Sequence, residues 1–171
     1  ESALGSAKQR AAHLERAAAE ARRAARGVDR GRAPSDAAAT AIRWAFEQIG
    51  VPYSWGGGDE NGPTRGFAQG ADTVGFDCSG LTLFSYAKAG IHLDHYTGSQ
   101  WQQGKRIGSR ADLQPGDLMF FAYDPSNEAT IHHVSIYIGN GRMIEAPYTG
   151  EVVRVTSAGR DDFIGATRPW A

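Results

Sequence analysis

Hydrophobic residues recur with a helical period in the first half of this chain and with a strand period in the second half. Residues 37–48 carry an apolar stripe at helical spacing, preceded by Ser35 or Asp36 in the N-cap position. A second helical run, residues 78–87, ends before Gly90, a residue type that commonly closes helices. We therefore expect a helix over each of these two stretches. The residues that the first helix should bury are Ile42, Ala45, Phe46 and Ile49.

Beyond Gly116 the alternation of apolar and polar residues indicates β-strands. Asn140-Gly141, between two of the apolar runs, is a strong signal for a tight hairpin turn. The expected strands are residues 117–123, 133–138, 142–146, 151–156 and 163–168. A polar, glycine-rich stretch, residues 59–74, should form a long loop. Helices followed by an antiparallel sheet predict an α+β fold.

Residues 1–32 differ in composition from the rest of the chain. They are rich in Ala and Arg and carry 8 Lys/Arg against 4 Asp/Glu, whereas residues 33–171 carry 10 against 15. An a/d heptad seam made mostly of alanine predicts a helix there, either the end of a stalk, a helix that docks on the domain, or a solvated linker. Gly31 and Pro34 break this pattern, so we expect a helical segment at 1–34 and one globular domain at 35–171.

Charge and hydropathy limit the possible partners of the domain. Its acidic balance argues against nucleic-acid binding, which needs a basic face. No apolar run in the sequence approaches the length that crosses a bilayer. His92, Asp94 and His95 lie close in sequence, but there is no cysteine pair to complete a zinc site, so we expect no metal and no other cofactor.

Cys78 is the only cysteine and lies where the second helix should begin. With Asp77 as the N-cap, Cys78 would belong to the first turn, where backbone N–H groups and the helix dipole favour a thiolate. A single cysteine cannot form an internal disulfide. Two interpretations are open from this stretch alone: a nucleophile, or a buried cysteine that acts as a small apolar side chain.

A nucleophilic thiol needs a neighbouring base, and the run from His133 to Ile138 offers one. Alternation places Val134, Ile136 and Ile138 on one face of this strand and His133, Ser135 and Tyr137 on the other. If the helix of Cys78 packs on the second face, His133 could take the thiol proton. His132 should face the opposite way and serve the substrate rim or the structure.

The imidazole in turn needs an acceptor that fixes its tautomer and orientation. With Asn140-Gly141 as the turn, Gly139 pairs with Arg142, and Glu145 falls opposite Ile136. Glu145 is then about three residues out of direct register with His133, so it is a candidate rather than a secure assignment. The other candidates are Asp77, Asp94 and Asp117.

Four blocks of the sequence together resemble the NlpC/p60 family of papain-like cysteine peptidases, which act on bacterial cell-wall peptides. The blocks are PYSWGG (52–57), FDCSGL (76–81), LQPGDL (113–118) and HVSIYIGNG (133–141). They occur in the order of the family and cover about residues 37–168. The likeness is greatest to the Rip-type peptidoglycan endopeptidases of mycobacteria, in residues 55–58, 62–66 and 145–150.

The resemblance implies a role for individual residues. Cys78 would be the nucleophile, His133 the base and Glu145 the residue that orients the histidine. Tyr53 would help the Cys78 backbone N–H to hold the oxyanion. The other residues expected to contact substrate are Trp55, Asp77, Ser79 and His132.

The resemblance also implies an activity and a location. We expect a peptidoglycan endopeptidase that cleaves stem peptides between D-glutamate and meso-diaminopimelate. It should be a secreted, monomeric protein of the cell wall whose signal peptide has been removed. Residues 1–34 would inhibit the site or contact other cell-wall hydrolases. The alternatives are a catalytically silent peptidoglycan-binding domain and an amidase or acyltransferase of the same fold.

Overall fold

The computed structural model describes residues 12, 15–16, 19 and 35–171. The heptad seam predicted in residues 1–32 lies outside the described residues. Within 35–171 the α-helices are α2 (Asp36–Glu47), α3 (Cys78–Ala87) and α4 (Thr97–Gln100), and the short 3-10 helices are η1 (Ala68–Gly70), η2 (Arg110–Asp112) and η3 (Glu128–Thr130). The strands are β1 (Thr64–Arg65), β2 (Val74–Gly75), β3 (Lys105–Ile107), β4 (Leu118–Ala122), β5 (Ile131–Gly139), β6 (Arg142–Glu145), β7 (Arg154–Ser157) and β8 (Phe163–Arg168).

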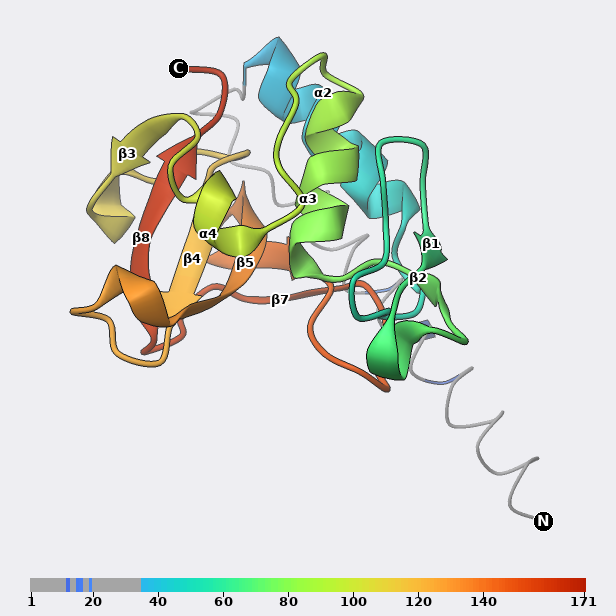
Figure 1. Ribbon diagram of the computed structural model, residues 1–171. Coiled ribbons are helices and arrows are strands. Elements are labelled where there is room, and N and C mark those ends of the chain that lie inside the picture. The colour runs from blue at the N-terminus through green and yellow to red at the C-terminus, as the bar shows by residue number, and fades with distance from the viewer. Residues whose placement is uncertain (1–11, 13–14, 17–18, 20–34) are drawn as a thin grey trace.

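Six of the strands form one antiparallel sheet in the order β3-β8-β4-β5-β6-β7 (Figure 1). Helix α3 packs on this sheet, and α2 packs against α3. The helices precede the sheet along the chain, as the change of periodicity predicted. The α+β fold is therefore confirmed.

Both predicted helices begin and end close to their expected bounds. Ser35 is the N-cap of α2, and its side chain accepts a hydrogen bond from the Ala38 N–H at 3.2 Å. The buried stripe of α2 was predicted wrongly in part, since its fully buried residues are Ala38, Ala41 and Ala45. Small side chains allow α2 to approach its neighbours closely, whereas the larger apolar residues of the predicted stripe are only partly buried beside them.

The strands of the six-stranded sheet lie close to their expected bounds except at β3 and β7. β3 was not predicted, because three residues give too short a pattern. β7 begins at Arg154, three residues later than expected, because Val152 and Val153 instead pair with the segment before Tyr53. The predicted loop 59–74 contains the β1–β2 pair and η1. Its C-terminal end is tied to the buried Ser54, whose hydroxyl donates to the Thr73 carbonyl at 2.7 Å.

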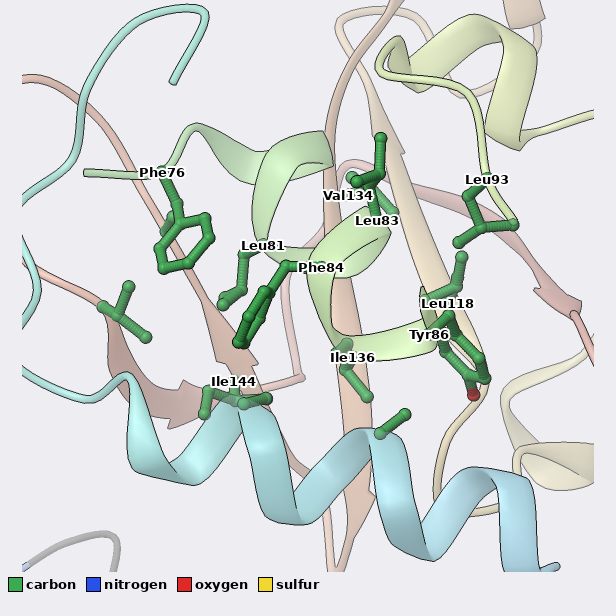
Figure 2. Close-up of a cluster of buried hydrophobic side chains, with 14 of the residues drawn as sticks. Phe76, Leu81, Leu83, Phe84, Tyr86, Leu93, Leu118, Val134, Ile136 and Ile144 are labelled. Carbon is green, nitrogen blue, oxygen red and sulfur yellow. The ribbon is translucent and has the colours of Figure 1, made fainter. Parts of the chain in front are cut away.

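The two faces of the sheet have separate apolar clusters. On the helical face, Leu81 and Phe84 of α3 meet Ile136 of β5 and Ile144 of β6 (Figure 2). The opposite face is covered by a smaller cluster made of Ile107, Leu113, Met119, Phe121, Met143, Ala158 and Ala166. The larger cluster fixes α3 on the sheet, and with it the position of Cys78.

The helices in the described part of the chain are too short or too polar to cross a bilayer.

Candidate active site

Cys78 is the first residue of α3 and a half-buried free thiol. Asp77 is the N-cap, as predicted, and its Oδ1 accepts a hydrogen bond from the Gly80 N–H at 2.7 Å. The thiol therefore lies in the first turn of a ten-residue helix. The first turn of a helix presents free backbone N–H groups and the positive end of the helix dipole.

His133 lies on β5 with only 4% of its surface exposed. Its Nε2 hydrogen-bonds to Glu145 Oε2 at 2.7 Å, so Nδ1 is the ring nitrogen that remains for Cys78. Burial alone would lower the pKa of His133, but side-chain hydrogen bonds with Cys78 and Glu145 outweigh burial and raise this pKa to about 9. The imidazole is thus protonated at neutral pH and can form an ion pair with a Cys78 thiolate.

Glu145 lies on β6 with 1% of its surface exposed, and each of its oxygens has partners. Oε1 accepts hydrogen bonds from Arg154 Nε at 3.2 Å and Nη2 at 3.1 Å, while Oε2 faces His133. Burial would raise the pKa of Glu145, but the hydrogen bond and charge of His133, together with Arg154, outweigh burial and lower it. The carboxylate is therefore ionised when the imidazolium forms.

A bulge in β5 brings Glu145 to His133, and the register predicted for this hairpin is wrong by one residue. Gly139 pairs with Arg142 as expected, but Tyr137 pairs with Met143, so Ile138 is an extra residue in β5. Ile136 then pairs with Ile144, and continuation of this ladder puts Glu145 opposite Ser135 instead of Ile136. Because Ser135 and His133 share a face, the bulge turns Glu145 toward the histidine.

Helix α3 packs on the opposite face of β5 from the one expected. It covers the apolar face of Val134 and Ile136 rather than the face of His133. The β5–β6 ladder spans only Ile136 to Gly139, so His133 lies on the part of β5 beyond it. There the first residue of α3 reaches the imidazole, and the rest of the helix remains on the apolar face.

His132 shares the cavity of His133, contrary to the predicted alternation. Phe121 pairs with His133 and Ala122 with Ile131, so His132 is the extra residue of a second irregularity in β5. Its Nε2 hydrogen-bonds to Asp162 Oδ2 at 3.0 Å, and its ring stacks on Tyr123 with centroids 4.0 Å apart. The irregularity interrupts the two-residue period on which the prediction rested.

The other carboxylates proposed as the partner of His133 either have other partners or are exposed. Asp117 is fully buried and accepts two hydrogen bonds from Arg168, at 2.8 and 2.9 Å. Asp77 accepts from Gly80 and hydrogen-bonds to His95, and Asp94 is exposed. Glu145 is the carboxylate that the structure brings to the histidine.

The residues expected to contact substrate differ in burial and in their partners. Tyr53 is buried; burial, then the charges of Cys78 and Asp77, raises the pKa of its phenol, so the hydroxyl stays protonated. Trp55 is 46% exposed and lines a cavity of about 770 Å³. Ser79 is buried, and its hydroxyl donates to Asp77 Oδ1 at 3.3 Å. Asp77 and Ser79 thus have partners within the protein.

The cavity opens beside His133 and Glu145. Its walls include Tyr53, Trp55, Tyr123, Tyr148, Arg154 and Arg160. No cluster of three or more His, Cys, Asp and Glu side chains suited to a metal ion occurs among the residues that the structure describes. The imidazole contacts the thiol on one side and the carboxylate on the other, next to a cavity with aromatic walls. Such an arrangement can perform nucleophilic acyl transfer.

Two residues beside this site were not predicted from the sequence. Arg154 is the direct partner of Glu145 across the β6–β7 ladder, a pairing that depends on the exact start of β7. Thr97 places its hydroxyl 3.6 Å from Cys78 Sγ, from a segment with no recognisable period. The charge of Arg154, opposite to that of Glu145, was the one feature of the sequence that could have predicted its role. No feature of the sequence pointed to Thr97.

Comparison with known proteins assigns this arrangement to a family. The model of the NlpC/P60 family matches residues 50–164. The chain belongs to the NlpC/P60 family. This confirms the resemblance inferred from the four sequence blocks, and both Cys78 and His133 lie within the matched region.

Relatives of this NlpC/P60 domain include proteins named as enzymes and one described as non-catalytic. Peptidoglycan endopeptidase RipA of Mycolicibacterium smegmatis is 53% identical over 115 residues, which cover 67% of this chain but only 22% of RipA. Structures of the Resuscitation Promoting Factor Interacting protein RipA, mutated in turn at a cysteine, a histidine or a glutamate, share 45% identity with a TM-score of 0.71, covering 77% of this chain and 61% of that one. The structure of RipD of Mycobacterium tuberculosis, a non-catalytic NlpC/p60 domain protein adapted to peptidoglycan binding, has 34% identity and a TM-score of 0.69, over 79% of this chain and 98% of the chain in that structure.

Proposed function

We propose that this domain is a peptidoglycan endopeptidase that hydrolyses the bond between D-glutamate and meso-diaminopimelate in stem peptides. The observation that supports the chemistry is the arrangement of Cys78, His133 and Glu145 at the start of α3. The names of the relatives support the substrate class. We further propose that the protein is secreted and acts in the cell wall.

In the first step, the Cys78 thiolate attacks the carbonyl carbon of the scissile amide and forms the C–S bond. The carbonyl oxygen becomes an oxyanion, which the Cys78 backbone N–H and the protonated Tyr53 hydroxyl would stabilise. As the C–N bond breaks, its electron pair goes to nitrogen, and His133 donates the proton from Nδ1 to the leaving amine.

In the second step, water hydrolyses the thioester. Neutral His133 accepts a proton from the water, whose oxygen attacks the thioester carbon. The C–S bond breaks, its electron pair returns to sulfur, and the thiolate–imidazolium pair is restored. Glu145 holds the imidazole through Nε2 in both steps, so the same nitrogen, Nδ1, exchanges protons each time.

A digest of purified muropeptides followed by mass spectrometry tests the bond and the nucleophile together. We expect two product masses that correspond to cleavage after D-glutamate, and a loss of about a thousandfold or more in rate for Cys78→Ala and for His133→Ala. Thermal unfolding of the variants controls for folding. Undiminished cleavage by Cys78→Ala would refute the mechanism.

The same digest separates the alternatives. A catalytically silent domain, such as RipD is described to be, would bind sacculi in a pull-down without releasing products. An amidase or acyltransferase of this fold would give products of other masses. The presence of the cysteine, histidine and glutamate at hydrogen-bonding positions favours turnover over silent binding.

For residues 1–34 we propose an inhibitory role, because their heptad pattern predicts a helix directly before the domain, and a helix that lay across the cleft would block it. Removal of these residues should increase the rate of muropeptide cleavage several-fold. Equal rates with and without the segment would reject this role.

A further inference from the structure

The Cys78 sulfur has a second polar neighbour besides His133, the hydroxyl of Thr97. Thr97 Oγ1 lies 3.6 Å from Cys78 Sγ, within the range of hydrogen bonds to the large sulfur atom. Thr97 is the first residue of α4 and is 8% exposed, so its hydroxyl is largely withdrawn from bulk water. A buried hydroxyl needs a partner inside the protein, and the sulfur is in position to be one.

Two sets of contacts fix the position of Thr97 relative to the thiol. The first set joins the segment just before Cys78 to the segment just before Thr97. His95 Nε2 lies 2.7 Å from Asp77 Oδ1, and the Asp77 Oδ2 accepts a hydrogen bond from the Gly56 N–H at 3.1 Å. Asp77 precedes Cys78, and His95 precedes Thr97 by two residues, so this pair aligns the two segments side by side.

The second set of contacts is centred on Gln100, at the end of α4. Its Nε2 donates to the Ser79 carbonyl at 2.9 Å and to the Asp94 carbonyl at 2.8 Å. Its Oε1 accepts from the Thr82 hydroxyl at 2.6 Å. Gln100 is fully buried, and both its N–H groups and its oxygen are hydrogen-bonded, which makes a rigid link between α4 and α3. Thr97 lies between these two links, facing the sulfur.

The charge state of the sulfur decides the direction of the hydrogen bond. A thiolate has no proton and can only accept, so the Thr97 hydroxyl must donate to it. A hydrogen bond to an ionised acceptor is stronger than one to the neutral thiol, and it therefore favours the charged form. We propose that Thr97 is a further catalytic residue, which donates a hydrogen bond to the Cys78 thiolate and holds it in line with His133.

This role rests on the proposed function of Cys78 as the nucleophile. Before attack, the hydroxyl increases the population of thiolate. As the C–S bond forms, negative charge moves from sulfur to the oxyanion, and the hydrogen bond weakens. When the thioester is hydrolysed, the electron pair returns to sulfur, and the same hydroxyl stabilises the leaving thiolate.

Because Cys78 is the only cysteine in the chain, its reactivity can be measured without substrate. The full chain is alkylated with the uncharged reagent iodoacetamide from about pH 4 to about pH 10, and the modified fraction is followed by mass spectrometry. Thr97→Val keeps the side-chain shape and removes the hydroxyl, whereas Thr97→Ser keeps the hydroxyl. Thr40→Val, on α2, is the matched control.

We expect the midpoint of the acid limb of alkylation to rise by about one pH unit in Thr97→Val, which is about a tenfold slower reaction on that limb. Thr97→Ser and Thr40→Val should keep the midpoint of the natural chain, and near-UV circular dichroism should show native packing in all variants. An unchanged midpoint in Thr97→Val, or an equal shift in Thr97→Ser, would overturn the proposal. The muropeptide digest reports separately on the proposed function, since alkylation requires no turnover.

Discussion

At the scale of single residues, the orientation of the Glu145 carboxylate depends on Arg154. The guanidinium occupies Oε1 with two hydrogen bonds, which leaves Oε2 for His133. Burial raises the pKa of Glu145, and Arg154 adds to the effect of His133 in lowering it, so without Arg154 the carboxylate would be protonated at a higher pH. We therefore expect Arg154 to act through Glu145 as a positioning residue.

Replacing Arg154 by Met should shift the acid limb of activity. His133 and Arg154 together lower the pKa of Glu145, and the variant loses the contribution of Arg154, so Glu145 becomes protonated at a higher pH and releases His133. We expect the acid limb of kcat/KM to move to higher pH and activity at neutral pH to fall about tenfold, with partial recovery in Arg154→Lys. Arg43→Met, at an exposed position of α2, is the control. An unchanged acid limb would exclude this role.

The raised pKa of His133 predicts the basic limit of activity. Its imidazolium is needed for the ion pair and is lost as pH rises through about 9, so kcat/KM should fall there rather than near 6.5. The stability of the fold should change with pH in the same direction. The raised pKa of His133 stabilises the fold fully below about pH 6.5, the pKa of histidine in the unfolded chain, and this contribution disappears as pH rises through about 9. In Glu145→Gln the basic limb should move to lower pH. A wild-type limb near 6.5 would contradict the predicted coupling.

The sequence predicted which residue types would meet at the site more reliably than how they meet. Cys78 and His133 follow from a helix start and a strand run, and both signals are local. The choice among Glu145, Asp77, Asp94 and Asp117 depended on a pairing between strands, which a local pattern does not fix. Arg154 and Thr97 lie at contacts made only in three dimensions.

At the scale of elements, two irregularities of β5 place side chains at the site that regular alternation would direct elsewhere. The bulge at Ile138 moves Glu145 to the face of His133, and the one at His132 turns a second histidine into the cavity. Neither is visible in the alternation, since an extra residue changes no residue's polarity. Gly139, with φ of +94°, is the one local sign of the first bulge.

Gly139→Ala should therefore destabilise the protein. An added Cβ would meet Pro115 Cγ at 3.6 Å, an ordinary contact, so the cost comes from the positive φ. We expect a loss of about 1–2 kcal/mol, or at least about 2–4 °C in Tm, with activity at 25 °C retained if the register is kept. Gly108 has open space around it and no positive φ, so Gly108→Ala should show no loss of stability. An unaltered Tm in Gly139→Ala would mean that the bulge tolerates a side chain.

At the scale of the whole molecule, the helical layer, the sheet and the C-terminal strand meet at one buried ion pair. Asp117 accepts two hydrogen bonds from Arg168 of β8 and one from the Gln114 N–H, and its backbone carbonyl accepts from the Tyr137 N–H. Next to it, the Tyr86 hydroxyl of α3 donates to the Gly116 carbonyl. The family block LQPGDL thus has a structural explanation in this chain.

Asp117→Asn should lower stability without changing the catalytic pH profile. The variant is isosteric, but it leaves Arg168, which is 11% exposed, without its anion. Breaking one side of a buried pair costs about 3 kcal/mol, or about 6–12 °C in Tm for a chain of this length. Asp161→Asn, at an exposed position, should leave Tm unchanged. Glu145 alone among the four candidate carboxylates hydrogen-bonds to His133, so the acid and basic limbs of kcat/KM should be unchanged in Asp117→Asn. A normal Tm with altered limbs would assign the orienting role to Asp117 instead.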